Sequence, residues 1–164
     1  MKKGFIYSVK KTNKTEFTQL KSRDISKFNV IHAKAKIINK KVTKWNEEPT
    51  MFFGIQTTKK NSTLINENEI MTSKEGIYFS CHRDFHVFSS NYKAFKTSLK
   101  FYEKGESLII RVDRIHDMLC FIDGYGESFC TSLSEVVDHE ISFNFHFLMK
   151  DFQEEFEVEF LNYY

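Results

Sequence analysis

Hydrophobic and polar residues alternate along most of this chain. In Val30–Ile38, apolar side chains at the odd positions alternate with His or Lys at positions 32, 34 and 36. A period of two predicts a β-strand with one face toward a core and the other toward water. The same pattern recurs in Glu140–Met149, where Asn144 and His146 fall on the side opposite the phenylalanines. It recurs again in Gln153–Leu161, where Glu alternates with Phe and Val.

Six further segments are typical of strands and are bounded by turn signals. They are Met51–Thr57, Gly76–His82, Phe85–Ser89, Ser107–Asp113, Met118–Ile122 and Phe129–Leu133. A hairpin turn is expected at Asp123-Gly124, because Gly tolerates a positive φ. Helical patterns are weak, and we expect only short helices, in Asn91–Lys100 and Ser132–Val137. Roughly ten short strands separated by turns predict an all-β fold, either a sandwich or a barrel.

Composition favours a single domain over residues 1–164. Hydrophobic side chains make up 41% of the 164 residues, so a chain of this size buries a core without disulfides or metals. It has one Pro and 6 Gly, with no linker-like stretch or repeat of fixed period. No apolar run approaches the roughly 18 residues of a membrane span, and the first residues lack the apolar region of a signal peptide. We therefore expect a cytoplasmic protein.

The charges are unevenly distributed, although the net charge is only +2. Residues 1–60 contain 15 Lys and Arg against 4 Asp and Glu, and residues 61–164 contain 9 against 18. One interpretation is a basic surface for nucleic acid or anionic lipid. The other, which we favour, is that the two halves interleave in one sandwich and neutralise each other. No arginine-rich run or aromatic RNA-binding signature occurs, so nucleic acid is not an expected partner.

The sequence shows no catalytic or cofactor motif. A Gly-x-Ser-x-Gly elbow, a phosphate-binding Gly loop and a dinucleotide fingerprint are all absent. Cys81 and His82 are adjacent on a predicted strand, so their side chains point to opposite faces. Cys81 and Cys120 lack Cys-x-x-Cys partners of the kind found in zinc sites, and buried cysteines usually behave as small hydrophobic residues. We expect no enzymatic activity, no cofactor and no metal.

The segment Lys104–Phe121, KGESLIIRVDRIHDMLCF, followed by IDGYGESF, resembles the central signature of SPRY (B30.2-like) domains. In that family a Gly-acid pair precedes a strand ending in Asp, here Asp113, and the next strand leads toward a small-residue turn, here Asp123–Gly126. Met51–Gln56, with Gly54, is similar to the family's "vGi" strand. The resemblance spans roughly residues 28–161. The chain departs from the family in lacking its Leu-Asp-Pro segment and its Trp-Glu-Val-Glu strand.

This resemblance implies a bent, two-sheet antiparallel β-sandwich of the SPRY/concanavalin-like jelly-roll type. It implies a protein–protein interaction module, an adaptor or a subunit of a larger complex, that binds a peptide or protein surface through loops at one end. Five residues in the predicted loops are candidates for contacts with the partner, because aromatic and Arg side chains dominate interfaces. They are Trp45, Arg83, Asp84, Tyr92 and Tyr125.

Two other binding functions fit the same strand pattern. One is a lectin-like jelly roll for carbohydrate or another small ligand, although the chain has one Trp and no clustered Asp/Asn loop for calcium. The other is an anion-binding surface made by the lysines of residues 1–60, whose affinity would fall steeply with salt. The acidic stripe Glu155, Glu157 and Glu159 fits a basic partner or, as we favour, the solvated face of a sheet.

Overall fold

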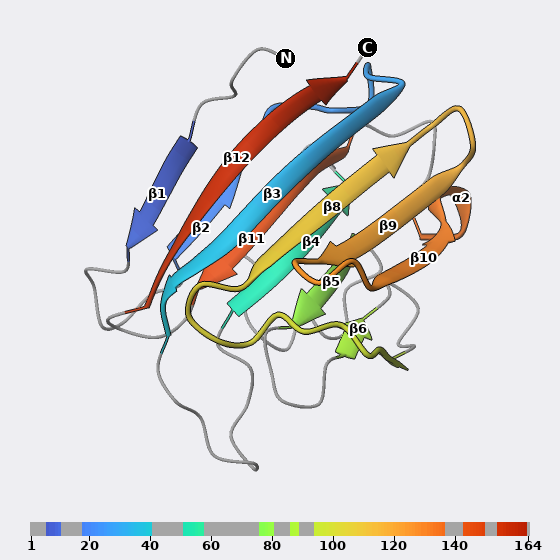
Figure 1. Cartoon of the computed structure of the whole chain (residues 1–164). Coiled ribbons are helices and arrows are strands. Elements are labelled where there is room, and N and C mark those ends of the chain that lie inside the picture. The colour runs from blue at the N-terminus through green and yellow to red at the C-terminus, as the bar shows by residue number, and fades with distance from the viewer. Residues whose placement is uncertain are drawn as a thin grey trace.

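The computed structural model describes residues 6–10, 18–40, 51–57, 76–80, 86–88, 94–136, 143–149 and 154–163. Their strands form two antiparallel sheets packed face to face (Figure 1). The first sheet has the order β1 (Ile6–Lys10), β12 (Glu155–Tyr163), β3 (Val30–Asn39), β8 (Ser107–Asp113), β9 (Met118–Asp123) and β10 (Ser128–Ser132). The second has the order β2 (Thr18–Lys21), β11 (Phe143–Met149), β4 (Met51–Thr57), β5 (Gly76–Ser80), β6 (His86–Phe88) and β7 (Ala94–Lys96).

This architecture confirms the predicted all-β, two-sheet antiparallel sandwich. Each of the nine segments predicted as strands overlaps an observed strand, and Met51–Thr57 and Ser107–Asp113 match in both bounds. The helix expected in Asn91–Lys100 is wrong, because β7 lies there and pairs with β6. Pairing with a neighbouring strand overrides the weak local preference for helix. The helix expected in Ser132–Val137 is confirmed as α2 (Leu133–Val136).

In the described part of the chain, no helix is long and apolar enough to span a membrane. Helix α2 has four residues and follows β10 directly.

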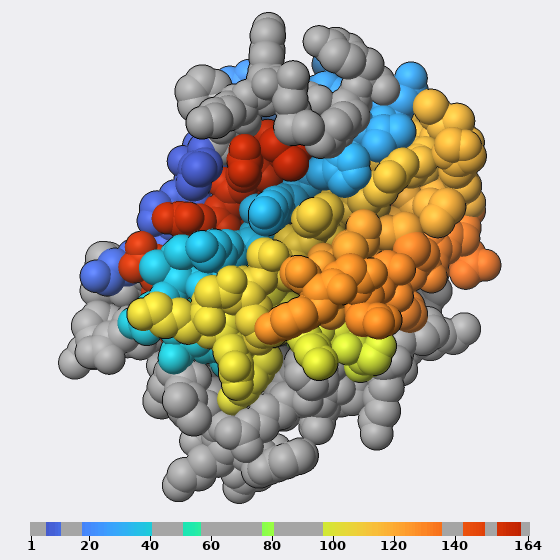
Figure 2. Space-filling view, viewed as in Figure 1, coloured from blue at the N-terminus to red at the C-terminus, as the bar shows by residue number. Residues whose placement is uncertain are grey.

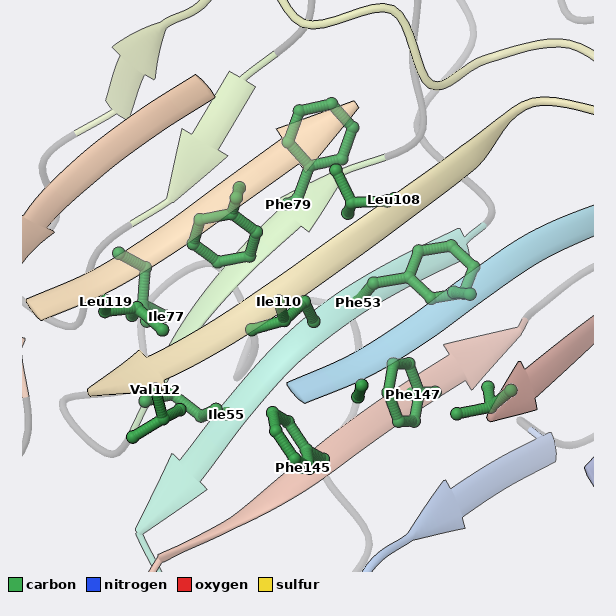
Figure 3. Packing of buried hydrophobic residues seen from close by; sticks show 14 of the residues in the cluster. Phe53, Ile55, Ile77, Phe79, Leu108, Ile110, Val112, Leu119, Phe145 and Phe147 are labelled. Carbon is green, nitrogen blue, oxygen red and sulfur yellow. The ribbon is translucent and has the colours of Figure 1, made fainter. Parts of the chain in front are cut away.

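The core lies between the inner faces of the two sheets (Figure 3). At its centre, the Phe53 ring of β4 lies 5.0 Å from the ring of Phe101, 5.7 Å from Phe147 and 5.2 Å from Phe156, each edge to face. Phe156 belongs to the first sheet and Phe147 to the second, so these rings join the layers. Such pairs add about 0.5–1.5 kcal/mol each beyond the apolar area that they bury. The Phe-rich composition is therefore largely a property of the core.

Opposite charges from the two halves of the sequence meet on the outer face of the first sheet. In the β3–β12 register, Lys34 lies opposite Glu159 and Lys36 lies opposite Glu157. Opposite charges at directly opposed positions stabilise a sheet by about 0.2–1 kcal/mol per pair. These pairs confirm that the halves interleave, and Figure 2 shows their strands as adjacent bands on one face.

The second sheet is buried on both faces at β11, contrary to the two-faced pattern of its sequence. All seven residues of this strand are buried, including Asn144, His146 and Leu148, which alternate with the core phenylalanines. Leu148 packs with Phe52 and Tyr78 in a separate apolar cluster. The alternating sequence therefore identified the strand correctly, but its prediction that one face is exposed to solvent is wrong.

Hydrogen bonds allow His146 to be buried on this outer face. Its Nδ1 lies 2.7 Å from the hydroxyl of Tyr78 and its Nε2 lies 2.8 Å from Oε1 of Gln19. Because Oε1 only accepts, Nε2–H donates to it, and Nδ1 accepts the hydroxyl proton of Tyr78. Gly54 of β4 is the cross-strand partner of both His146 and Tyr78. Since Gly54 has no side chain, the two rings meet over it.

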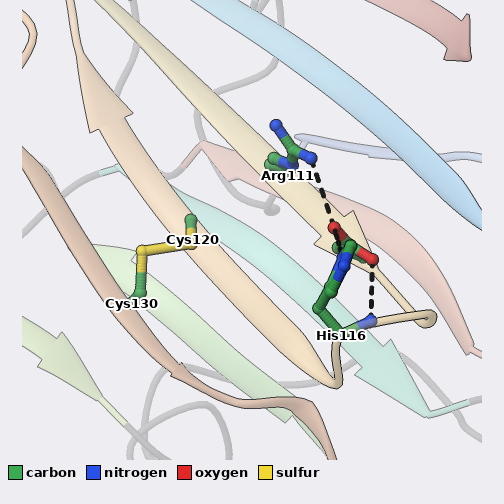
Figure 4. Close-up of a disulfide and its surroundings, with 5 residues drawn as sticks. Arg111, His116, Cys120 and Cys130 are labelled. Atoms are coloured by element: carbon green, nitrogen blue, oxygen red, sulfur yellow. Dashed lines mark hydrogen bonds and ion pairs between the residues drawn. A yellow bond between two sulfur atoms is a disulfide. The ribbon is translucent and has the colours of Figure 1, made fainter.

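Two of the cysteines form a disulfide, so the expectation of small buried thiols is wrong for this pair (Figure 4). Cys120 of β9 and Cys130 of β10 are directly opposed, with their Cα atoms 4.1 Å apart. Opposed residues of an antiparallel pair hold their side chains on the same face and within reach of each other. Cys120 is 5% exposed, whereas Cys130 is exposed. Cys81 lies outside the described residues.

Candidate functional site

The turn between β9 and β10 is organised by one buried carboxylate, that of Asp123. Its Oδ1 accepts hydrogen bonds from the backbone N–H groups of Tyr125 (2.9 Å) and Glu127 (3.0 Å). Its Oδ2 accepts a third from the N–H of Lys100 (2.8 Å), in the segment that leads into β8. Gly126 closes the turn at a φ of +91°, which favours glycine. Asp123 thus joins two neighbouring segments, seen together in orange and yellow in Figure 2.

This arrangement presents an aromatic ring and a cation to solvent. The side chain of Tyr125 is 68% exposed, and Nζ of Lys100 lies 5.4 Å from the centre of its ring. Two residues after Lys100, the ring centre of Tyr102 lies 4.6 Å from Nζ of Lys40, which follows β3. Ammonium groups at such distances are attracted to the ring face. We name the surface formed by Lys100 and Tyr125, on the turn that Asp123 holds, the Tyr125 surface.

Of the five candidate binding residues, the structure places only Tyr125. Trp45, Arg83, Asp84 and Tyr92 lie outside the described residues, so their proximity to the Tyr125 surface stays a prediction.

Two strands of the described part end at the same end of the sandwich as the Tyr125 surface. Strand β3 reaches it near Ile37, whose carbonyl accepts the N–H of Gly105 at 2.8 Å. Strand β5 reaches it near Phe79, whose ring lies 6.4 Å from that of Phe121. Trp45 follows β3 in the chain, and Arg83 and Asp84 follow β5.

The opposite end of the first sheet carries a second organised turn, which the sequence reading missed as a site. Asp113, at the end of β8, accepts hydrogen bonds from the N–H of His116 (3.0 Å) and from its Nδ1 (2.9 Å), and Arg111 lies 3.2 Å away (Figure 4). Burial by itself raises the pKa of Asp113, but the hydrogen bonds from His116 and Arg111 outweigh it and lower the pKa to about 2.

Two apolar side chains stand exposed beside Asp113. Ile115, in the turn, is 64% exposed and Met118, at the start of β9, is 39% exposed. The sequence signal is an Ile inside the polar run Arg114-Ile115-His116-Asp117. The carboxylate of Asp113 holds the turn that presents both side chains.

Among the residues that the structure describes, no group of three or more His, Cys, Asp or Glu side chains is placed to hold a metal ion. The polar groups of both turns instead bond to the backbone and to each other.

Comparison with known proteins identifies the fold. No family model and no curated protein matches the sequence. The carbohydrate recognition domain of Emp46p, in its metal-free form, matches with a TM-score of 0.60 and 11% identity, over 96% of this chain and 87% of that one. The TRIM65 PSpry domain matches with a TM-score of 0.56 and 8% identity, over 88% of this chain and 70% of that one. The SPRY domain of human HERC1 matches with a TM-score of 0.54 and 9% identity, over 88% of this chain and 78% of that one.

At these identities the comparisons show the fold alone. They support the resemblance to SPRY domains at the level of architecture and place lectin domains beside them.

Proposed function

We propose that this chain is a protein-interaction module that binds a peptide or protein surface through the Tyr125 surface and the loops around it. The observation that carries the proposal is a solvent-exposed tyrosine on a turn that a buried aspartate holds rigid. Tyrosine is among the residues that contribute most at interfaces, and a preformed turn loses little entropy on binding. SPRY domains are among the similar structures, and the resemblance of the sequence to that family implies protein binding.

The same turn favours a protein partner over the lectin alternative. A sugar site needs side-chain acceptors that are free for hydroxyl groups, along with an aromatic ring. Both oxygens of Asp123 already accept backbone N–H groups, three in all. What the turn offers to a ligand is the ring of Tyr125 with the ammonium of Lys100 beside it. A ring and a cation suit a peptide that carries apolar and acidic groups.

Replacing Tyr125 with Ala is expected to weaken partner binding about 10-fold, the loss typical of an interface aromatic residue. The measurement uses the full chain as bait for affinity capture from its native cells, followed by titration of each captured protein against the purified variants. Ile115→Ala is the matched control, because Ile115 is equally exposed but lies at the other end of the first sheet. A triple variant, Arg83→Ala, Tyr92→Ala and Tyr125→Ala, tests the other loops.

Equal affinities for Tyr125→Ala and the unchanged chain would contradict the proposed surface. A loss confined to Ile115→Ala would move the site to the Asp113 turn. Binding to a glycan array that Tyr125→Ala abolishes, with no captured protein, would favour the lectin alternative.

A further inference from the structure

The disulfide between Cys120 and Cys130 joins the last two strands of the first sheet. Among the described strands, β10 ends this sheet and pairs with β9 alone. Cys130 is exposed on this strand, and Cys120, its direct partner on β9, is 5% exposed. One sulfur of the bond is therefore open to a reagent from solvent, while the other is shielded.

A cationic residue lies on the strand next to the shielded cysteine. Arg111 of β8 is the direct cross-strand partner of Cys120, so the two side chains share the outer face of the sheet (Figure 4). On the other side of Arg111, His32 of β3 is its direct cross-strand partner. A carboxylate oxygen of Asp113 lies 3.2 Å from the guanidinium and orients it. A nearby guanidinium stabilises a thiolate and makes it a better leaving group.

We propose that Cys130 is a reversible modification site for a low-molecular-weight thiol of the glutathione class, with Cys120 as the resolving thiol. This inference does not depend on the proposed function, because it rests on the disulfide and on Arg111 and uses no residue of the Tyr125 surface.

The thiol–disulfide exchange proceeds in two steps. The thiolate of the small thiol attacks Sγ of Cys130, a mixed disulfide forms, and the bond to Cys120 breaks. The electron pair of that bond leaves on Sγ of Cys120, the residue directly opposite Arg111 on β8. In one path, the thiolate of Cys120 then attacks Sγ of Cys130 and expels the small thiol. In the other, a second small thiol attacks the mixed disulfide and releases Cys130. The second path oxidises two small thiols to their disulfide and reduces the protein pair to two thiols.

Single-cysteine variants test the roles of the two sulfurs, with Cys81→Ser in every protein so that a third thiol does not interfere. In Cys120→Ser, oxidised glutathione is expected to add to Cys130 and to remain there, because no resolving thiol is present. In Cys130→Ser, addition to the shielded Cys120 is expected to be at least about 10-fold slower. Intact mass against time gives both rates, and circular dichroism checks that each variant is folded.

Arg111→Gln tests the leaving group in the protein that keeps both cysteines. Reduced glutathione is expected to open its disulfide several-fold more slowly than in the parent. Lys34→Gln is the control, because it removes a cation from the same face that is not opposite a cysteine.

Equal addition rates at Cys120 and Cys130 would overturn the assignment. So would a disulfide that stays closed in a large excess of reduced glutathione, or equal opening rates in the Arg111 and Lys34 variants. If Cys81→Ser does not fold, peptide mapping of the unmodified sequence after glutathione treatment decides between Cys130 and the other cysteines.

Discussion

Acidification from pH 6.5 to 3 is expected to lower the free energy of unfolding by on the order of 4 kcal/mol through His146 alone. Burial of this side chain, and then the charge of Lys21, which lies opposite it on β2, lower the pKa of His146 from 6.5 to about 3.

The direction follows from proton uptake. Between pH 6.5 and 3 the unfolded chain binds a proton at this histidine and the folded chain does not, so stability rises with pH in that window. The contribution of neutral His146 to the free energy of unfolding is complete above pH 6.5. It is lost as the pH falls to the pKa of His146 in the folded state, about 3. His32, whose pKa is lowered by burial and then by Arg111, adds to the loss below pH 6.5. Asp113 adds another loss between its ordinary pKa of 3.8 and about 2.

Urea unfolding at a series of pH values measures this effect. His146→Gln is expected to be less stable at neutral pH but to show a flatter dependence between pH 6.5 and 3. Tyr78→Phe is the control, because it removes the hydrogen bond, at a cost of about 1 kcal/mol, and leaves the histidine buried. The free energy of unfolding of Tyr78→Phe should keep the full dependence on pH between 6.5 and 3. An unchanged slope in His146→Gln would show that His146 is not the group that titrates.

Gly54→Ala is expected to destabilise the fold by about 3 kcal/mol or more, the upper range for side chains forced into packed space. A Cβ at this position would lie 2.0 Å from the carbonyl oxygen of Ile77 and 2.8 Å from Cα of Tyr78. Both atoms belong to the backbone of β5, so relief requires β4 and β5 to separate in the middle of the second sheet. The contact between the rings of Tyr78 and His146 would be disturbed as well.

Gly105→Ala is the matched control for this effect. Gly105 has a φ of +88° and open space around it, so its replacement costs only the strain of that conformation, about 1–2 kcal/mol. Thermal and urea unfolding of both variants give the comparison. Equal losses for Gly54→Ala and Gly105→Ala would show that crowding against β5 is not what requires the glycine.

The local pattern of the sequence was sufficient to locate most of the strands. Alternation at Val30–Ile38 predicted β3 because side chains in a strand point to opposite faces, whatever the strand pairs with. The resemblance singled out Gly54 and Asp123, and the structure supplies physical reasons for both. Gly54 lets β4 approach β5, and Asp123 accepts three backbone N–H groups.

The candidate site was predicted only in part. Tyr125 lies in the turn expected at Asp123-Gly124, but the glycine with a positive φ is Gly126, so the reason given for Gly124 is wrong. Ile115 was missed, since exposure depends on how far the β8–β9 turn projects from the sheet.

By itself, the sequence determined which segments are strands and which side of most of them is apolar, because both properties reside in neighbouring residues. Only the tertiary structure decided the strand partners, and with them the pairing of Cys120 with Cys130, the contact of His146 with Tyr78 and the opposition of lysines to glutamates. These contacts join residues on different strands. No local pattern specifies them, because they follow from the register between strands and from the way the two sheets close over their core.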